Sequence, residues 1–149
     1  MKTNLIRILA LLTAGLLATT TLVRADPKNL DAPNHGRMIT GLEPRAEVLL
    51  RPDRKIQITF VDKDGQPVSA AGQVVTVTTG DRLHPTQLTF TTSGTVLVSD
   101  RVAPPGNNLP TVVQITPSAG AKAIIERFNL NLSTCSECGQ AEYACSCDH

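Results

Sequence analysis

The chain has no tryptophan and few other aromatic residues. Its 149 residues include one Tyr and three Phe, so aromatic platforms for stacking on bases or sugar rings are scarce. The 14 Lys and Arg residues are scattered singly along the chain. Because nucleic-acid binding depends on a one-sided basic surface, we expect no nucleic-acid partner.

Catalytic motifs are missing as well. No carboxylate pair, Ser-His-Asp set or glycine-rich phosphate loop stands out in the sequence. These are the arrangements that place a nucleophile, a base or a phosphate cradle at a reacting bond. We therefore expect a protein that is not an enzyme.

The first 25 residues have the arrangement of a secretory signal peptide. Lys2 and Arg7 precede an apolar run at residues 8–17, and Val23-Arg24-Ala25 supplies a small-residue cleavage site. This order predicts a signal helix that is removed after Ala25. The run is shorter than the roughly 20 residues that span a bilayer. We expect a periplasmic or secreted protein with no membrane attachment after cleavage.

Cleavage would leave a chain of the size of one domain. Residues 26–149 number 124, which suits a single compact unit. The removed segment carries three basic residues and no acidic one, so the formal net charge changes from +1 to −2.

Short segments rich in Val, Ile, Thr and Leu recur from Glu47 onward, and no helical periodicity is sustained. In the clearest of them, Ile56, Ile58 and Phe60 alternate with polar residues, which predicts a strand with one apolar face. The turn residues Asp62 to Gly65 follow it. The predicted strands cover residues 47–50, 55–61, 73–79, 86–92, 95–102, 111–116 and 123–132.

This pattern predicts an all-β fold, an immunoglobulin-like antiparallel β-sandwich of about seven strands. The antibody type, which needs a buried Trp and an inter-sheet disulfide, is excluded because the chain has no Trp and no cysteine before Cys135. We expect a signal peptide at residues 1–25, an N-terminal arm at 26–45, a β-sandwich domain at 46–132 and a Cys-rich tail at 133–149.

All the cysteines of the chain lie in the tail, as Cys135, Cys138, Cys145 and Cys147. The Cys-x-x-Cys pair followed by Gly139 resembles a zinc knuckle, in which a glycine with positive φ lets backbone N–H groups point at the sulfurs. Four thiolates satisfy tetrahedral Zn²⁺, and soft sulfur ligands equally suit Cu(I). The four cysteines, with His149 as a further ligand, form the predicted metal site.

Two other states of the cysteines stay open. An exported protein meets oxidising conditions, which favour disulfides. A Cys145–Cys147 bridge is at the edge of disulfide geometry, so the pairings are 135–145 with 138–147, or 135–147 with 138–145. A redox-active thiol pair is disfavoured, because such a pair begins a helix, and the acidic neighbours Glu137 and Glu142 are expected to raise the pKa of nearby thiols.

His35 and Met38 are a second candidate pair of copper ligands. His35 and Met38 could equally well serve only in loop and core packing, since neither is paired with another ligand at a metal-binding spacing.

A stretch near the start of the predicted domain resembles small uncharacterised periplasmic proteins of bacteria, some of which accompany heavy-metal efflux systems. The resemblance rests on Asn34-His35-Gly36-Arg37-Met38, on Glu47, and on the turn from Asp62 to Val68. It covers about residues 33–68 and implies a periplasmic, metal-related role. The histidine-rich arm of such proteins is missing here.

Together these features predict an exported, non-enzymatic binding protein whose cysteine cluster coordinates Zn²⁺ or Cu(I). The alternative is a structural or interaction module with a disulfide-stapled tail, in which an exposed sheet edge docks a protein partner.

Overall fold

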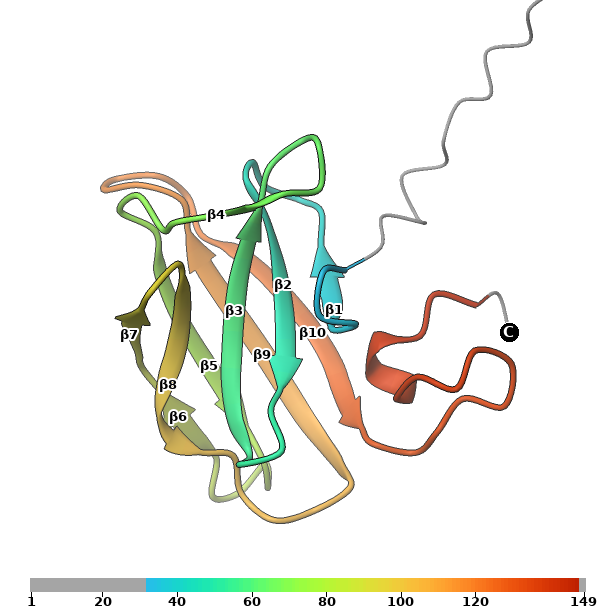
Figure 1. The fold of residues 1–149 in the computed structure, drawn as a ribbon. Helices are drawn as coiled ribbons and strands as arrows, with labels where there is room; N and C mark the ends of the chain where they lie inside the picture. The colour runs from blue at the N-terminus through green and yellow to red at the C-terminus, as the bar shows by residue number, and fades with distance from the viewer. Residues whose placement is uncertain (1–31, 148–149) are drawn as a thin grey trace, which may run out of the picture.

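The structure is a computed structural model that describes residues 32–147 (Figure 1). The predicted signal peptide and His149 lie outside the described residues. Within residues 32–147 the chain forms ten strands and one short 3-10 helix, so the expectation of an all-β fold is confirmed. No helix in this range is long and apolar enough to cross a membrane.

The strands form two antiparallel sheets. The larger sheet has the order β1-β2-β3-β8-β7, with β4 paired to β3, and the smaller one has the order β10-β9-β5-β6. The strand bounds are β1 Arg37–Ile39, β2 Arg45–Leu50, β3 Lys55–Val61, β4 Pro67–Val68, β5 Val74–Thr79, β6 Thr86–Leu88, β7 Phe90–Ser93, β8 Val96–Val102, β9 Asn108–Thr116 and β10 Ile124–Asn131.

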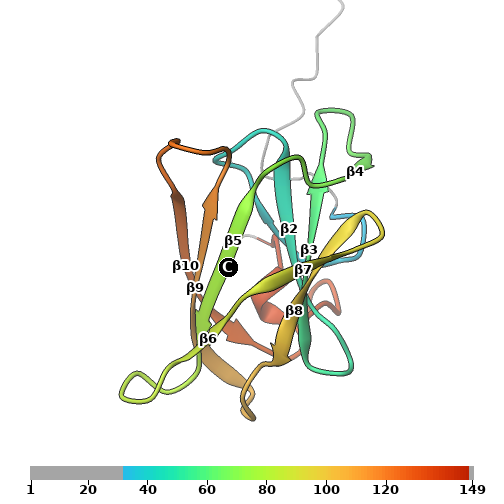
Figure 2. The ribbon, with the colours of Figure 1, turned by 90° about the vertical axis from the view of Figure 1, so that its left-hand side faces the viewer.

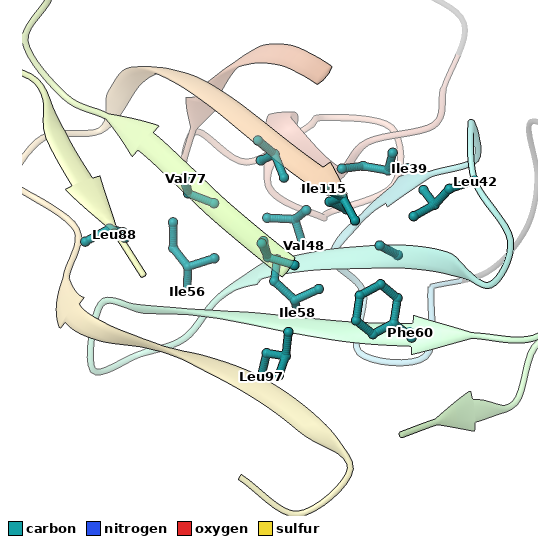
Figure 3. Packing of buried hydrophobic residues seen from close by; sticks show 13 residues of the cluster. Ile39, Leu42, Val48, Ile56, Ile58, Phe60, Val77, Leu88, Leu97 and Ile115 are labelled. Carbon is teal, nitrogen blue, oxygen red and sulfur yellow. The ribbon is translucent and has the colours of Figure 1, made fainter. Parts of the chain in front are cut away.

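The two sheets pack face to face around an aliphatic core (Figures 2 and 3). Period-two alternation explains this core, because every second residue of a strand points to the same face. In β3, Ile56, Ile58 and Phe60 are fully buried, as the sequence predicts. Val77 of β5 and Val113 of β9 face them from the smaller sheet. Burial of each such side chain contributes about 1.5–3 kcal/mol, so the core needs no disulfide.

One predicted strand is divided between the two sheets. Residues 86–92 were expected to form a single strand, but β6 pairs with β5 in the smaller sheet and β7 pairs with β8 in the larger one. The change of partner occurs at Thr89, whose N–H donates to the Asp100 carboxylate at 2.9 Å and whose carbonyl accepts from the Asp100 N–H at 2.8 Å. The chain therefore crosses between the layers at this point.

Part of the segment expected as an N-terminal arm belongs to the larger sheet. Residues 37–39 form β1, which pairs with β2. Ile39 and Leu42 are buried in the central core. The strand β1, the two-residue β4 and the division of residues 86–92 raise the number of strands from the expected seven to ten.

The tail leaves β10 and folds back beside the edges of both sheets (Figure 1). Its 3-10 helix η2 (Glu142–Ala144) contacts β10 and β1. The Leu132 N–H donates to the Asn107 carbonyl at 2.8 Å, which fixes the start of the tail. The position of η2 brings the cysteine cluster next to the sandwich.

Candidate metal centre

The four tail cysteines lie close together. Their four Sγ atoms all lie within 4.8 Å of one another. The Cys135 and Cys145 sulfurs are 3.3 Å apart, and those of Cys138 and Cys145 are 3.6 Å apart. Four sulfurs bound to Zn²⁺ at about 2.3 Å in a tetrahedron are separated by about 3.8 Å. The spacing of the four sulfurs therefore suits a metal ion.

The first pair of cysteines is held by a tight turn. The Gly139 N–H donates to the Cys135 carbonyl at 2.9 Å, and the Cys135 N–H donates to the Gln140 carbonyl at 2.7 Å. Gly139 has φ +73°, a conformation that glycine adopts without strain. The backbone N–H groups of Cys138 and Glu137 point at the Cys135 sulfur and lower the pKa of this thiol to about 6. The positive φ expected of Gly139 is confirmed, whereas the lowered pKa of Cys135 is opposite to the expectation from its acidic neighbours.

The second pair follows η2. The Cys147 N–H points at the Cys145 sulfur at a distance of 3.3 Å. This N–H favours the Cys145 thiolate, but the neighbouring Cys135 sulfur and burial outweigh it and raise the pKa of Cys145. Contacts with the Cys145 and Cys138 sulfurs also raise the pKa of Cys147. A bound cation would supply the positive charge that allows these crowded thiols to ionise together.

Tyr143 anchors the cluster to the sandwich. This residue, the only tyrosine of the chain, is 5% exposed and packs against Leu109 and Leu130. Its ring stacks on Phe128 with the ring centroids 6.4 Å apart. Its hydroxyl oxygen accepts the Leu50 N–H at 3.1 Å. Two residues before Cys145, the chain is thus attached to both sheets.

Arg37 of β1 connects the same elements. Its guanidinium lies 4.8 Å from the centre of the Phe128 ring, a cation–π contact. It also forms an ion pair with Glu126 at 2.9 Å and donates to the Tyr143 carbonyl at 3.3 Å. Neither Arg37 nor Tyr143 was predicted from the sequence to dock the tail. The position of the single tyrosine between the two cysteine pairs was the available signal.

His35 does not belong to the cysteine group. It is exposed, at φ +60°, whereas Met38 is partly buried in β1. Within residues 32–147, the four cysteines are the only group of three or more His, Cys, Asp or Glu residues placed to hold a metal ion. His149 lies beyond this range, so its predicted role as a ligand stays a prediction.

Glu47 has a structural role that the sequence analysis did not assign. Its carboxylate is fully buried and accepts the Asn34 N–H at 2.8 Å, the Asn34 side-chain amide at 2.7 Å and the Gly36 N–H at 2.8 Å. A Cβ on Gly36 would lie 2.5 Å from the Val48 carbonyl oxygen. The residues that carry the sequence resemblance at this point therefore lock a loop onto β2.

No protein-family model, curated protein or solved structure matches this chain. The site is therefore interpreted from its own geometry.

Proposed function

We propose that this protein is an exported, non-enzymatic binding protein whose tail coordinates one Zn²⁺ or Cu(I) ion. Cys135, Cys138, Cys145 and Cys147 are the proposed ligands. The observation that carries the proposal is the approach of all four sulfurs to within 4.8 Å of one another. Soft thiolates select these two metals, and a closed set of four favours tetrahedral Zn²⁺.

In this proposal the ion fixes the tail on the sandwich and has no open position for a reaction. Closed four-ligand sites of this kind are structural in zinc proteins. The docking contacts of Tyr143 and Arg37 support this role, because they attach the cysteine cluster to both sheets. Export is supported by the signal-peptide pattern of residues 1–25. The immunoglobulin-like subtype and the likeness to periplasmic metal-related proteins belong to the same proposal.

Native mass spectrometry of the purified protein tests the metal site. We expect a mass higher by one metal ion, whose identity elemental analysis supplies, and four alkylatable thiols after chelation. Cys138→Ser should lose the ion, whereas Ser136→Ala in the same turn is the matched control and should retain it. A mass four protons light, with no thiol that reacts with the alkylating agent, would overturn the proposal.

The second candidate function is an interaction module with a disulfide-stapled tail. The short distance of 3.3 Å between the Cys135 and Cys145 sulfurs favours it, because a modest movement would reach the disulfide bond length of about 2.05 Å. Formation of two disulfides would remove four protons and two electron pairs, with an oxidant of the exported compartment as the electron acceptor. Peptide mapping of non-reduced protein would then recover 135–145 linked together with 138–147.

A further inference from the structure

A groove of about 640 Å³ lies at one end of the smaller sheet, where the loop from β5 to β6 meets β9 and β10. Figure 2 shows this loop projecting beyond the end of the sheet. Small-molecule sites commonly have volumes of about 300–1,000 Å³. The groove therefore has room for a small organic molecule.

The outer face of the sheet forms the floor. Thr78, Val112 and Arg127 are cross-strand neighbours, so their side chains share one face. The adjacent residues Val77 and Val113 are fully buried on the core side, which places the three lining residues on the outer side. Strand alternation thus directs a cation and an apolar side chain into the groove.

The apolar part of the lining includes two prolines. Pro110 of β9 lies beside Val112 along the floor, and Pro85 belongs to the loop that forms the wall. The Pro110 carbonyl accepts the Gly80 N–H at 3.2 Å, which ties the beginning of this loop to the sheet. Rigid rings of this kind give a flat apolar surface at little conformational cost.

Arg82 and Arg127 both line this groove, and their side chains form no hydrogen bond or ion pair with any residue in the described range. Every other arginine between residues 32 and 147 is engaged. Arg37, Arg51 and Arg101 pair with carboxylates, while Arg45 and Arg54 donate to backbone carbonyls. Two arginines without a carboxylate partner in the lining of one groove make its potential positive, which favours an anionic ligand.

Asp81 limits the charge that the groove can accept. Asp81 also belongs to the lining, but one oxygen of its carboxylate accepts the Leu83 N–H at 2.7 Å and the His84 N–H at 3.2 Å within its own loop. Two arginines and one aspartate leave a net charge of about +1 in the groove, and a ligand with a single negative charge matches it.

We propose that this groove binds a small organic carboxylate with a flat apolar body. The carboxylate pairs with Arg82 and Arg127, whose planar guanidinium groups suit the geometry of a carboxylate. The apolar body lies against Pro85, Pro110 and Val112. This site is separate from the cysteine cluster and does not depend on the proposed metal function.

Titration calorimetry with 2-naphthoate tests the proposal on the purified protein. We expect one molecule bound per chain with a submillimolar Kd. Arg82→Gln and Arg127→Gln should each weaken binding about tenfold, the consequence of losing one charge-assisted hydrogen bond. Arg51→Gln is the matched control, because this partly exposed arginine pairs with Asp53 and does not line the groove. The affinity of this variant for 2-naphthoate should be unchanged.

Two further ligands separate the contribution of the negative charge from that of the apolar body. Inorganic phosphate supplies charge without an apolar body, and 2-naphthalenemethanol supplies the apolar body without charge, so both should bind at least about tenfold more weakly than 2-naphthoate. Equal binding of the alcohol, full affinity in the double arginine variant, or no heat of binding with millimolar naphthoate would each overturn the proposal. Unchanged thermal unfolding of the variants would show that the fold is intact.

Discussion

Removal of the proposed metal ion is expected to release the tail from the sandwich and expose Tyr143. In the docked tail this side chain is 5% exposed, stacked on Phe128 and bonded to the Leu50 N–H. The chain has no Trp and no other Tyr. Tyrosine emission and the near-ultraviolet circular dichroism of tyrosine therefore report on the tail alone.

The free energies indicate that docking of Tyr143 alone is too weak to order the tail. Fixing the 15 residues from 133 to 147 costs about 1 kcal/mol per residue or more, hence about 15 kcal/mol. Burial of the tyrosine ring, with roughly 150–250 Å² removed from water, contributes about 4–6 kcal/mol. The shortfall of about 10 kcal/mol is close to the apparent binding free energy of structural Zn²⁺, about 10–16 kcal/mol.

The assay compares acrylamide quenching of Tyr143 in loaded and chelated protein under reducing conditions. Quenching should rise severalfold when the ion is removed and return after one equivalent of Zn²⁺ is added. The far-ultraviolet spectrum should stay that of a β-protein, because the sandwich has its own core. Cys138→Ser should abolish the recovery, and Ser136→Ala should not. A Tyr143 that remains protected without metal would refute the reasoning.

Three substitutions test the supporting contacts. Glu47→Gln replaces a buried carboxylate that accepts three hydrogen bonds with an amide, so urea unfolding should show a loss of about 2–4 kcal/mol. A loss below about 0.5 kcal/mol would contradict the proposed lock. Gly139→Ala adds a Cβ that has no neighbouring atom within 4 Å, at a residue with φ +73°. The expected cost is therefore backbone strain alone, about 1–2 kcal/mol. Chelator competition should show the Zn²⁺ affinity lowered about tenfold. Arg37→Gln removes the cation–π contact with Phe128, which contributes about 1 kcal/mol. Hydrogen exchange should then show the tail opening roughly fivefold more often. Arg51→Gln should leave the opening of the tail unchanged.

The strands that could be predicted are those with strong alternation. β3 begins and ends at the residues expected from Ile56, Ile58 and Phe60, since a strand with one apolar face has a single favourable orientation toward a core. The tight turn at Gly139 could also be predicted, because Cys-x-x-Cys-Gly combines ligand spacing with a residue that tolerates positive φ. Both features are local, so their signals lie within a few neighbouring residues.

The features that could not be predicted depend on partners far apart in the sequence. The division of residues 86–92 between two sheets follows from the bonds of Thr89 to Asp100 and not from any break in composition. Likewise, Arg37 contacts Tyr143, which is 106 residues later in the chain. The sequence contains the residue types for such contacts but not the register that brings them together.

Phe128 of β10 is in contact with the docked tail and also belongs to the proposed groove. Its ring stacks on Tyr143 of the tail, and Phe128 also contributes to the lining of the groove beside Arg127. Since adjacent residues of a strand point to opposite faces, β10 presents one face to the core and the tail and the other to the groove. Release of the tail would take one neighbour from Phe128 but leave Arg82 and Arg127 in place. We therefore expect metal-free protein to bind 2-naphthoate with unchanged affinity. The metal site and the carboxylate groove can thus be tested independently of each other.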